Sequence, residues 1–504
     1  MNELQDPPET INPSSLKSAV FVEYTLFSLL LLLVLFFVFF HNAHASVNHA
    51  IAPFSTEAAA RSAEAGSAGL RMRSAIGLLS FAGIAFVIGQ VRTRRLAVSW
   101  RTIIWGILVQ FVFAVLVLDT APGRLFFDSV NGGVTALLGF ATQGASFVFG
   151  DLVSNNVPVG SPLGANGPIV APTAYAHTGA FFAFTVLPTI VFFSALSALL
   201  YYSGIMQWVI QSVAWVMQRT MRTSGMETLS AAANIFLGQT EAPLIVKPFV
   251  ATATRSELMA ILVAGFANIA SGVMAAYVAM LHGFYPDIAG HLLAASIISA
   301  PSSLVVAKLL LPEHEKAETA AGVKFHIERT DANAIDATAR GALEGLQLSL
   351  NVGAVLIAFI AVVALINAVI GLCGERFGVH GLSFEEILGW ISTPVCWLMG
   401  ISWHDALKVG PLLGIKTALN EFVAYLQMSQ MLTTNPNFVS PRSLIMTTYA
   451  LCGFANFSSV AIQIGGISGM APNRRGDLAR LGLIAMVGGA ISSLMAACMV
   501  GILL

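Results

Sequence analysis

The sequence predicts an all-α polytopic membrane protein with inverted structural repeats, two re-entrant helical hairpins and two broken transmembrane helices. Three observations lead to this prediction: scarce charge, long apolar runs, and a polar motif that occurs twice. Of the 504 residues, 56% are hydrophobic and 10% are charged, against about a quarter charged in soluble domains. A mean hydropathy of +0.78 means more apolar surface than one soluble core can bury, whereas a bilayer accepts apolar helices of about 20 residues.

Nine apolar runs are each long enough to cross a hydrocarbon layer of about 30 Å. They are residues 19–40, 75–91, 102–118, 179–204, 258–281, 289–311, 344–371, 444–467 and 480–504. We interpret the first as an uncleaved helix, because it is long for a signal peptide and the acidic residues before it have the wrong charge. The four cysteines lie in or beside apolar segments, without zinc or redox spacing, and we interpret them as core residues.

Arginines in short loops predict the orientation, since cytoplasmic loops carry most of the positive charge. Basic residues cluster between the second and third spans, after the fourth, and before the last. If these loops are cytoplasmic, the N-terminus is cytoplasmic, and residues 119–178 and the C-terminus lie outside. Arg71 and Arg73 do not fit, because they fall on the outer side. The net charge of −1 offers no basic face for nucleic acid.

The segment 230–248 contains a polar centre between two short apolar arms. Each arm has about nine or ten residues, or about 14 Å of helix, which reaches only half-way across a membrane. Gly238 and Pro243 break the helix, so we expect a re-entrant hairpin with Gln239, Thr240 and Glu241 near the midplane. The segment 410–432 has the same form around Asn420 and Glu421.

The spans after these hairpins carry nearly the same motif, GFANIAS at 265–271 and GFANFSS at 453–459, with five of seven positions identical. Glu241 and Glu421 are 180 positions apart (421 − 241), and Asn268 and Asn456 are 188 apart (456 − 268). The first hairpin is flanked by more basic residues than the second, so the two are expected to enter from opposite sides. Inverted repeats of this kind place the binding site where broken elements meet at mid-membrane.

The repeat divides the chain into five parts. These are an extra transmembrane helix with an outer segment (1–73), scaffold helices with an outer or interfacial segment (74–178), a first repeat with hairpin 1 (179–311), a cytoplasmic linker (312–340), and a second repeat with hairpin 2 (341–504).

The two membrane carboxylates are candidate site residues, because a charge at the bilayer centre costs at least a few kcal/mol. The alternative is structural: Glu241 could pair with Lys247, and Glu421 with Lys416. Their matched places in the repeat favour function. Breaking a helix also leaves carbonyls free, so Asn234, Asn268 and the carbonyls of Leu237 and Ile269 could offer oxygen to a small cation such as Na⁺. Each Asn could instead merely hydrogen-bond a neighbour.

Three motifs resemble the concentrative nucleoside transporter family: GQTEAP at 238–243, NEFVAY at 420–425 and CGFANFSS at 452–459. The resemblance covers residues 75–504, with the motifs in the family's order. It implies a homotrimeric bacterial-type sodium/nucleoside symporter of the cytoplasmic (inner) membrane. Each protomer would carry a uridine-like or adenosine-like nucleoside together with an ion, by alternating access, and would need no cofactor besides that coupling ion.

The resemblance also implies roles for single residues. Nucleobase contacts would fall on Gln239, Thr240, Glu241, Val273, Leu348 and Phe454; ribose contacts on Glu421, Asn456 and Ser459; and sodium ligands on Asn234, Leu237, Asn268 and Ile269. The sodium-coupled bacterial pattern has Ser where this chain has Asn268. An amide still presents an oxygen, so Na⁺ is the expected ion and H⁺ the alternative.

Other function classes have less support. The sequence contains no G-x-S-x-G elbow, no H-E-x-x-H motif and no Gly-Lys dipeptide of a P-loop, which disfavours a membrane enzyme and an ATP-driven pump. An ion channel, or a carrier for another small polar solute, stays open. A carrier is distinguished from a channel by uptake that saturates with solute and depends on an ion gradient.

Overall fold

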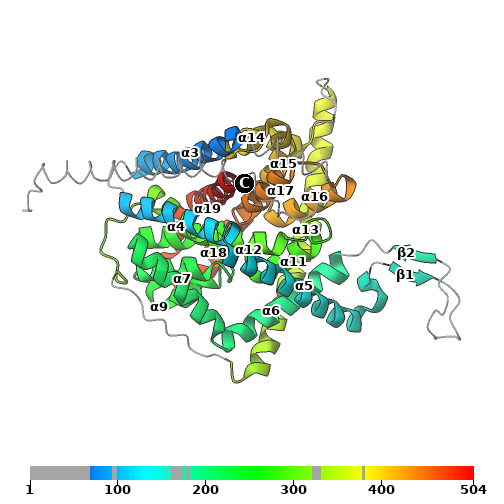
Figure 1. The fold of residues 1–504 in the computed structure, drawn as a ribbon, viewed down its shortest axis with the longest axis horizontal. Helices are drawn as coiled ribbons and strands as arrows, with labels where there is room; N and C mark the ends of the chain where they lie inside the picture. The colour runs from blue at the N-terminus through cyan, green and yellow to red at the C-terminus, as the bar shows by residue number, and fades with distance from the viewer. Residues whose placement is uncertain are drawn as a thin grey trace, which may run out of the picture.

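The structure is a computed structural model that describes residues 68–93, 99–154, 156–159, 174–177, 182–320, 331–376, 378 and 381–504. The expected span at 19–40 lies outside these residues. Eight described helical segments are long and apolar enough to cross a membrane. They are Ala68–Arg92, Trp100–Leu118, Ala121–Val153, Phe182–Tyr202, Arg255–Leu281, Ile288–Leu310, Ala334–Arg376 and Pro472–Leu503. The predicted helical membrane fold is confirmed (Figure 1).

The N-terminal scaffold has three long helices, and the third was not expected. They are α3 (Ala68–Thr93), α4 (Trp100–Leu118) and α5 (Ala121–Phe149). Thr120 caps α5 by accepting from Gly123 N at 3.0 Å, and a proline in the first turn suits a helix start. Its hydropathy of 1.3 is the lowest of the eight segments, which explains why the sequence pattern did not mark it as a span.

A short segment follows α5: a 3₁₀ turn, η1 (Gly150–Ser154), and two antiparallel strands, β1 (Asn156–Val159) and β2 (Ala174–His177). The strands pair from Asn156 opposite His177 to Val159 opposite Ala174. In Figure 1 this pair stands apart from the helices. It is an addition to the expected all-helical architecture.

The first repeat begins with α6 (Leu187–Tyr202), entered through a π-helical turn, η2 (Phe182–Val186), and continues into α7 (Ile205–Met221). Hairpin 1 follows, made of α8 (Gly225–Ala233), η3 (Ala242–Val246) and α9 (Lys247–Val250). The broken helix consists of α10 (Arg255–Ala267) and α11 (Ser271–Leu281), and the repeat ends with α12 (Ile288–Leu310). The hairpin and the break are where the sequence predicts them.

The second repeat has the same five parts in the same order. They are α13 (Ala334–Arg376); α14 (Phe384–Met399); hairpin 2, α15 (Trp403–Ala418) and α16 (Glu421–Thr434); the broken pair α17 (Pro441–Leu451) and α18 (Phe457–Met470); and, after η4 (Pro472–Arg474), α19 (Arg475–Leu503). The expected single span at 444–467 is therefore two half-helices. The structural repeat also includes the long helices on either side of each hairpin.

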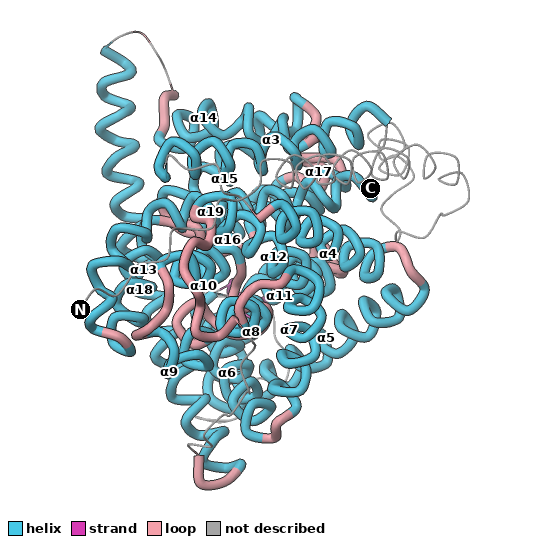
Figure 2. The backbone as a smooth tube through the Cα atoms, turned by 90° about the vertical axis from the view of Figure 1, so that its left-hand side faces the viewer, coloured by secondary structure: helices cyan, strands magenta, loops and turns pink. Residues whose placement is uncertain are grey.

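Helix α13 is 43 residues long, or about 64 Å at 1.5 Å per residue. It begins inside the expected 312–340 linker, and only 11% of its most apolar window is buried. In Figure 2 its C-terminal turns stand clear of the other helices. Cys373 on this helix is exposed, so its interpretation as a core residue was wrong, whereas Cys396, Cys452 and Cys498 are buried.

The last helices of the two repeats pack together at the centre. Nearly all of α12 is buried, and it contacts α19 along with α10, α17 and α4. Two serine hydroxyls bond carbonyls across the crossing: Ser302 Oγ donates to Ser492 O and Ser492 Oγ to Ser299 O, both at 3.3 Å. Small residues allow this close approach of two membrane helices, and the broken helices pack around this central pair.

Candidate functional site

Each hairpin and each broken helix begins at a Ser or Thr cap. Ser224 and Thr254 form capping boxes with Glu227 and Glu257, three residues later. In the second repeat the caps are Ser402 and Ser440, which accept from Asp405 N at 3.2 Å and Ser443 N at 3.3 Å. The caps are 178 (402 − 224) and 186 (440 − 254) positions apart, close to the separations of the two Glu and the two Asn.

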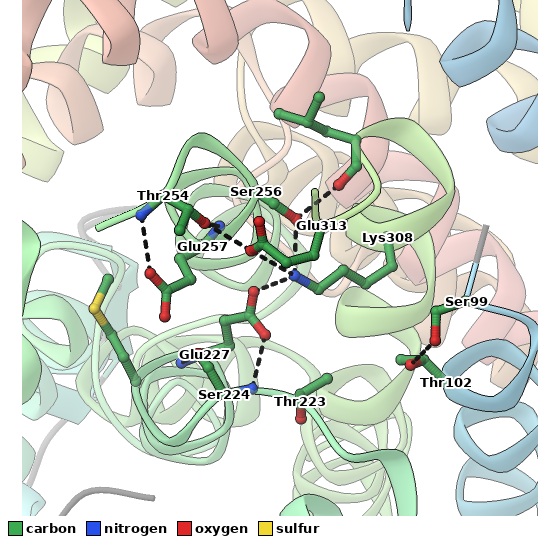
Figure 3. Close-up of polar contacts among 12 residues, drawn as sticks. Ser99, Thr102, Thr223, Ser224, Glu227, Thr254, Ser256, Glu257, Lys308 and Glu313 are labelled. Atoms are coloured by element: carbon green, nitrogen blue, oxygen red, sulfur yellow. Dashed lines mark hydrogen bonds and ion pairs between the residues drawn. The ribbon is translucent and has the colours of Figure 1, made fainter. Parts of the chain in front are cut away.

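A buried cluster of charges ties the first-repeat elements together (Figure 3). Lys308, near the end of α12, forms an ion pair with Glu227 of hairpin 1. Its amine also donates to Ser256 Oγ of α10 at 2.8 Å and lies 3.7 Å from Glu313. One lysine therefore joins the start of the hairpin, the start of the broken helix and the end of α12. We call this cluster the lysine clamp.

Arg442 of α17 lies at the second-repeat position that matches Ser256 of α10, 186 positions later (442 − 256). Its buried guanidinium donates to the carbonyls of Gly400 and Gly501, both at 2.6 Å, and to Ser74 Oγ at 3.0 Å. These carbonyls belong to the C-terminal ends of α14 and α19, where a cation is favoured by the helix dipole. We call this the arginine clamp, and it uses carbonyls where the lysine clamp uses carboxylates.

The hairpin 1 tip, residues 238–242, presents a carboxylate and two neutral polar groups. Glu241 is exposed in the single chain, and one of its oxygens accepts from Gly238 N at 3.1 Å. Gln239 is buried, and its Oε1 accepts from Gln463 Nε2 of α18 at 3.0 Å. Thr240 lies against α18, because a Cβ at Gly466 would be 2.7 Å from the Thr240 methyl. Hairpin 1 thus rests on the broken helix of the other repeat.

The hairpin 2 tip, residues 419–421, carries the second carboxylate. Glu421 is only 4% exposed. Its Oε1 accepts from Tyr277 Oη at 2.9 Å and its Oε2 from Asn456 Nδ2 at 3.0 Å. Two charge-assisted bonds from opposite sides fix the orientation of this carboxylate.

Neither carboxylate forms a direct ion pair with a described lysine, although Lys416 is close enough to Glu421 to interact electrostatically. No ion pair among the described residues includes Glu241 or Glu421. Lys247 is exposed, and the buried Lys416 amine donates to Ala450 O at 2.7 Å.

Asn456 organises the second break, residues 452–456. Its Oδ1 accepts from Ser459 N at 2.9 Å and from Ser458 Oγ at 2.7 Å, while its amide donates to Glu421. Asn456 is thereby both the cap of α18 and a support for the hairpin 2 tip. The structure brings Glu421, Asn456 and Ser459, which the resemblance assigned to ribose, into one hydrogen-bonded group.

The first break, residues 268–270, leaves oxygens without partners. The Oδ1 atoms of Asn234 and Asn268 are buried and accept no hydrogen bond from any described residue, although each amide donates to the carbonyl four residues earlier. The carbonyls of Leu237 and Ile269 also accept none in the described part of the chain. Ser271 N donates to Phe236 O at 3.1 Å, so the two segments lie side by side. Buried acceptors without donors fit a hard cation such as Na⁺.

The remaining expected base contacts lie on three elements. Val273 is buried on α11, Phe454 is half-buried in the second break, and Leu348 is half-buried on α13. Leu348 lies one turn after Glu344, which is close enough to Glu241 to interact electrostatically. Val273 belongs to the buried apolar core, and Leu348 and Phe454 pack against that core.

Sequence reasoning missed Tyr277 and Gln463, each of which contacts a hairpin tip. The signal was present, since each is a polar residue in an otherwise apolar membrane helix, where unsatisfied polar groups are costly. Neither lies in a repeated motif, so neither was selected.

Comparison with known proteins agrees with this geometry. Models described as "Na+ dependent nucleoside transporter" match at residues 76–152 (N-terminus) and 291–501 (C-terminus), and one described as "Nucleoside recognition" matches at 183–284. Mouse sodium/nucleoside cotransporter 1 is 41% identical over 443 residues, 84% of this chain and 64% of the relative. Solute carrier family 28 member 3 of Eptatretus stoutii is 38% identical over 439 residues, 85% of this chain and 60% of the relative. The chain thus spans less than two thirds of these relatives' length.

Solved structures of CNTnw are similar over nearly their whole length. The inward-facing substrate-bound state has 38% identity and a TM-score of 0.75, and covers 86% of this chain and 98% of that one. An outward-facing variant has 38% identity and a TM-score of 0.76 over the same shares. The order of the repeats, the two hairpin tips and these matches lead to one conclusion: the chain belongs to the Na⁺-dependent, concentrative nucleoside transporter family.

Proposed function

We propose that the protein is a secondary active symporter that imports nucleosides, driven by a Na⁺ gradient. The observation that carries this proposal is that candidate ion ligands and candidate solute-binding residues lie on the same hairpin. Among the described residues, one buried amide oxygen without a donor lies at the first break (Asn268) and another on hairpin 1 beside it (Asn234), and carboxylates lie at both hairpin tips. The segment that holds Asn234 and Leu237 is bonded to the first break through Ser271 N and Phe236 O, so an ion there would contact the hairpin that also holds Gln239 and Glu241.

The solute site has two poles. At the base pole, Gln239, Thr240 and Glu241 offer donors and acceptors to a nucleobase edge, with Val273, Leu348 and Phe454 as apolar contacts. At the ribose pole, Glu421 and Asn456 are already hydrogen-bonded to each other, and Ser459 is the adjacent hydroxyl. A carboxylate accepts at up to about four lone-pair positions, so Glu421 keeps acceptor capacity for a ribose hydroxyl after bonding Tyr277 and Asn456.

Coupling follows from the shared hairpin. An ion held by Asn234, Leu237, Asn268 and Ile269 would tie hairpin 1 to the first break and fix its tip for the base. Linkage then requires that the solute raise the affinity for the ion by the same factor. One positive charge that moves down 100 mV releases about 2.3 kcal/mol, which is nearly fiftyfold in solute concentration at equilibrium.

Further parts of the proposal come from the family resemblance and, for the orientation, from the arginine-rich loops. The protein is a homotrimer in a bacterial inner membrane, with its N-terminus cytoplasmic and its C-terminus outside. Alternating access moves the hairpins and broken helices against the scaffold helices. The long, exposed α13 offers an apolar surface that neighbouring protomers or lipid would cover.

The test is labelled uridine and adenosine uptake into proteoliposomes, with Na⁺ or H⁺ gradients imposed separately. Saturable uptake that follows the Na⁺ gradient is expected for at least one nucleoside. Uptake that follows only the H⁺ gradient would mean that the protein is a carrier whose coupling ion is H⁺ and not Na⁺. Failure of both nucleosides under both gradients would reject the proposal, and ion flux without nucleoside would indicate a channel.

A further inference from the structure

Each hairpin tip is held by a helix of the opposite repeat. Tyr277 lies on α11 of the first repeat, and its hydroxyl donates to Glu421 Oε1 of hairpin 2 at 2.9 Å. Gln463 lies on α18 of the second repeat, and its amide donates to Gln239 Oε1 of hairpin 1 at 3.0 Å. Both helices are the second halves of broken helices, so the two contacts form a crossed pair.

Both side chains are fully buried and held in place. Tyr277 stacks on Tyr425 with ring centroids 4.4 Å apart and meets Phe422 edge-on at 5.3 Å. Gln463 makes a second bond to Leu262 O at 3.3 Å. Gly265 makes room for Gln463, because a Cβ at that position would be 2.7 Å from its amide nitrogen. Neither group can turn away from its partner without a shift of the surrounding helices.

We infer that Tyr277 and Gln463 are positioning residues, each of which orients a solute-site residue on the hairpin of the opposite repeat. This inference rests on the proposed function. Tyr277 orients the Glu421 carboxylate for ribose, and Gln463 orients the Gln239 amide for the base. Tyr277 follows the break that carries Asn268 and Ile269, so the geometry at the ion site extends along α11 to the ribose pole. Gln463 follows the second break, so the ribose side is linked in turn to the base pole.

The chemistry at each pole differs, which makes the inference specific. Tyr277 donates its hydroxyl to the buried Glu421 carboxylate, and the Asn456 amide is the second donor to that carboxylate. Losing one donor to a buried charge weakens and reorients its remaining interactions. Gln463 bonds the carbonyl oxygen of Gln239, so it decides which end of that amide faces α18 and which end faces a base. Loss of the Tyr277–Glu421 contact should affect sugar recognition, and loss of the Gln463–Gln239 contact should affect base recognition.

The experiment measures Vmax/KM for uridine, adenosine, 2′-deoxyuridine and 3′-deoxyuridine in proteoliposomes at saturating Na⁺. Tyr277→Phe should lower Vmax/KM for uridine about tenfold. For the analogue that lacks the hydroxyl bound by Glu421, it should lower Vmax/KM by less than about twofold. Gln463→Met should change the uridine-to-adenosine ratio about tenfold and leave the uridine-to-deoxyuridine ratios within about twofold.

Tyr425→Phe is the matched control. Tyr425 packs on the same ring of Tyr277, but its hydroxyl donates to Thr448 O and not to a carboxylate. Its loss should lower the uptake of all four solutes by the same factor. If Tyr277→Phe also acts equally on all four, its role is only packing and the inference is overturned. The same holds for Gln463 if its variant leaves base preference unchanged.

Failure of this inference is distinguishable from failure of the proposed function. Glu421→Gln, measured in the same vesicles, tests the ribose pole itself. Wild-type uptake by that variant would remove Glu421 from the site and reject the proposed site. Lost uptake by Glu421→Gln together with equal effects of Tyr277→Phe on all solutes would reject only the crossed positioning.

Discussion

The two breaks carry the same asparagine in different surroundings. Asn268 Oδ1 is buried and accepts no hydrogen bond from the residues that the structure describes. Asn456 Oδ1 accepts from Ser459 N and Ser458 Oγ, and its amide donates to Glu421. One backbone arrangement therefore leaves an open oxygen ligand in the first repeat and a complete hydrogen-bond network in the second. The difference supports the proposed division of tasks, in which the ion binds at the first break and the sugar at the second.

The two hairpin-tip carboxylates also differ in how deeply they are buried and how many hydrogen bonds hold them. Glu421 is buried and held by two side chains of other elements, whereas Glu241 is exposed and bonded only within its own hairpin tip among the described contacts. A preorganised group loses little freedom when a ligand binds. In the proposed site, the ribose pole is therefore ordered before the solute binds, whereas the base pole would be ordered by the solute and the ion.

The largest expected effect comes from neutralising the carboxylates. Glu421→Gln should lower uridine Vmax/KM about a thousandfold, because an amide places donors against the Asn456 amide and removes a buried acceptor, at a cost of about 4 kcal/mol. Glu241→Gln should also abolish measurable uptake, with a smaller loss of equilibrium binding because its site is open. Vesicle uptake and calorimetric binding of uridine measure the two quantities. Near wild-type uptake by either variant would exclude that residue from the site.

The two clamps should differ in what their loss does to stability. Lys308→Met leaves Glu227 buried without its cation, and breaking such a pair costs about 3 kcal/mol or more. Arg442→Met leaves carbonyls unbonded but no buried anion, so a smaller loss is expected. The thermal midpoint in detergent measures both, and Lys308→Met combined with Glu227→Gln should recover part of the loss. Equal effects of the two single variants would contradict the distinction between the clamps.

The asparagines should separate ion dependence from solute dependence. Asn268→Leu should raise the Na⁺ concentration for half-maximal uptake at least about tenfold, because it removes one of few oxygen ligands, whereas Asn268→Ser keeps an oxygen and should change it less. Asn456→Leu should lower uptake at every Na⁺ concentration. Uptake titrated with Na⁺ at saturating uridine checks this. An unchanged Na⁺ curve for Asn268→Leu would place the ion elsewhere.

The smallest expected effect is at the helix caps. Ser402→Ala and Ser224→Ala each remove one cap bond, worth about 1 kcal/mol. The loss should be larger for Ser224, because its hydroxyl caps the helical turn that holds Glu227, the partner of Lys308. Thermal midpoints of the two variants, compared with Ser402→Thr as the conservative control, would show the difference. A larger loss at Ser402 would mean that the lysine clamp does not depend on the cap.

Much of the site could be predicted because the sequence repeats its breaks. Gly238 with Pro243 marked hairpin 1, and the two GFAN motifs marked both broken helices. Helix breaks have strong local signals, and a repeat doubles each of them. The residues that support the hairpin tips could not be found in this way, since Tyr277 and Gln463 act across repeats and no local pattern shows which helices meet.

The scaffold was predicted less well for a related reason. Helix α5 contains enough Gly and polar residues to lower its hydropathy to 1.3, and α13 extends well into the expected polar linker. Hydropathy locates apolar length but not where a helix stops beyond it. The pairing of α6 with α13, and the full five-part repeat, became visible only from the packing of the chain.

The second break touches the first at a glycine. Gly453 has φ +142°, and a Cβ there would be 2.8 Å from Phe266 O and 2.9 Å from Ala267 O. The next residue, Phe454, donates its backbone N–H to Asn268 O at 3.3 Å. The two breaks, which are the proposed ion and sugar sites, are therefore joined through main-chain atoms. A change of side chain at position 454 leaves this main-chain joint in place, whereas any side chain at position 453 would collide with it. The joint thus depends on one glycine and not on the residue beside it.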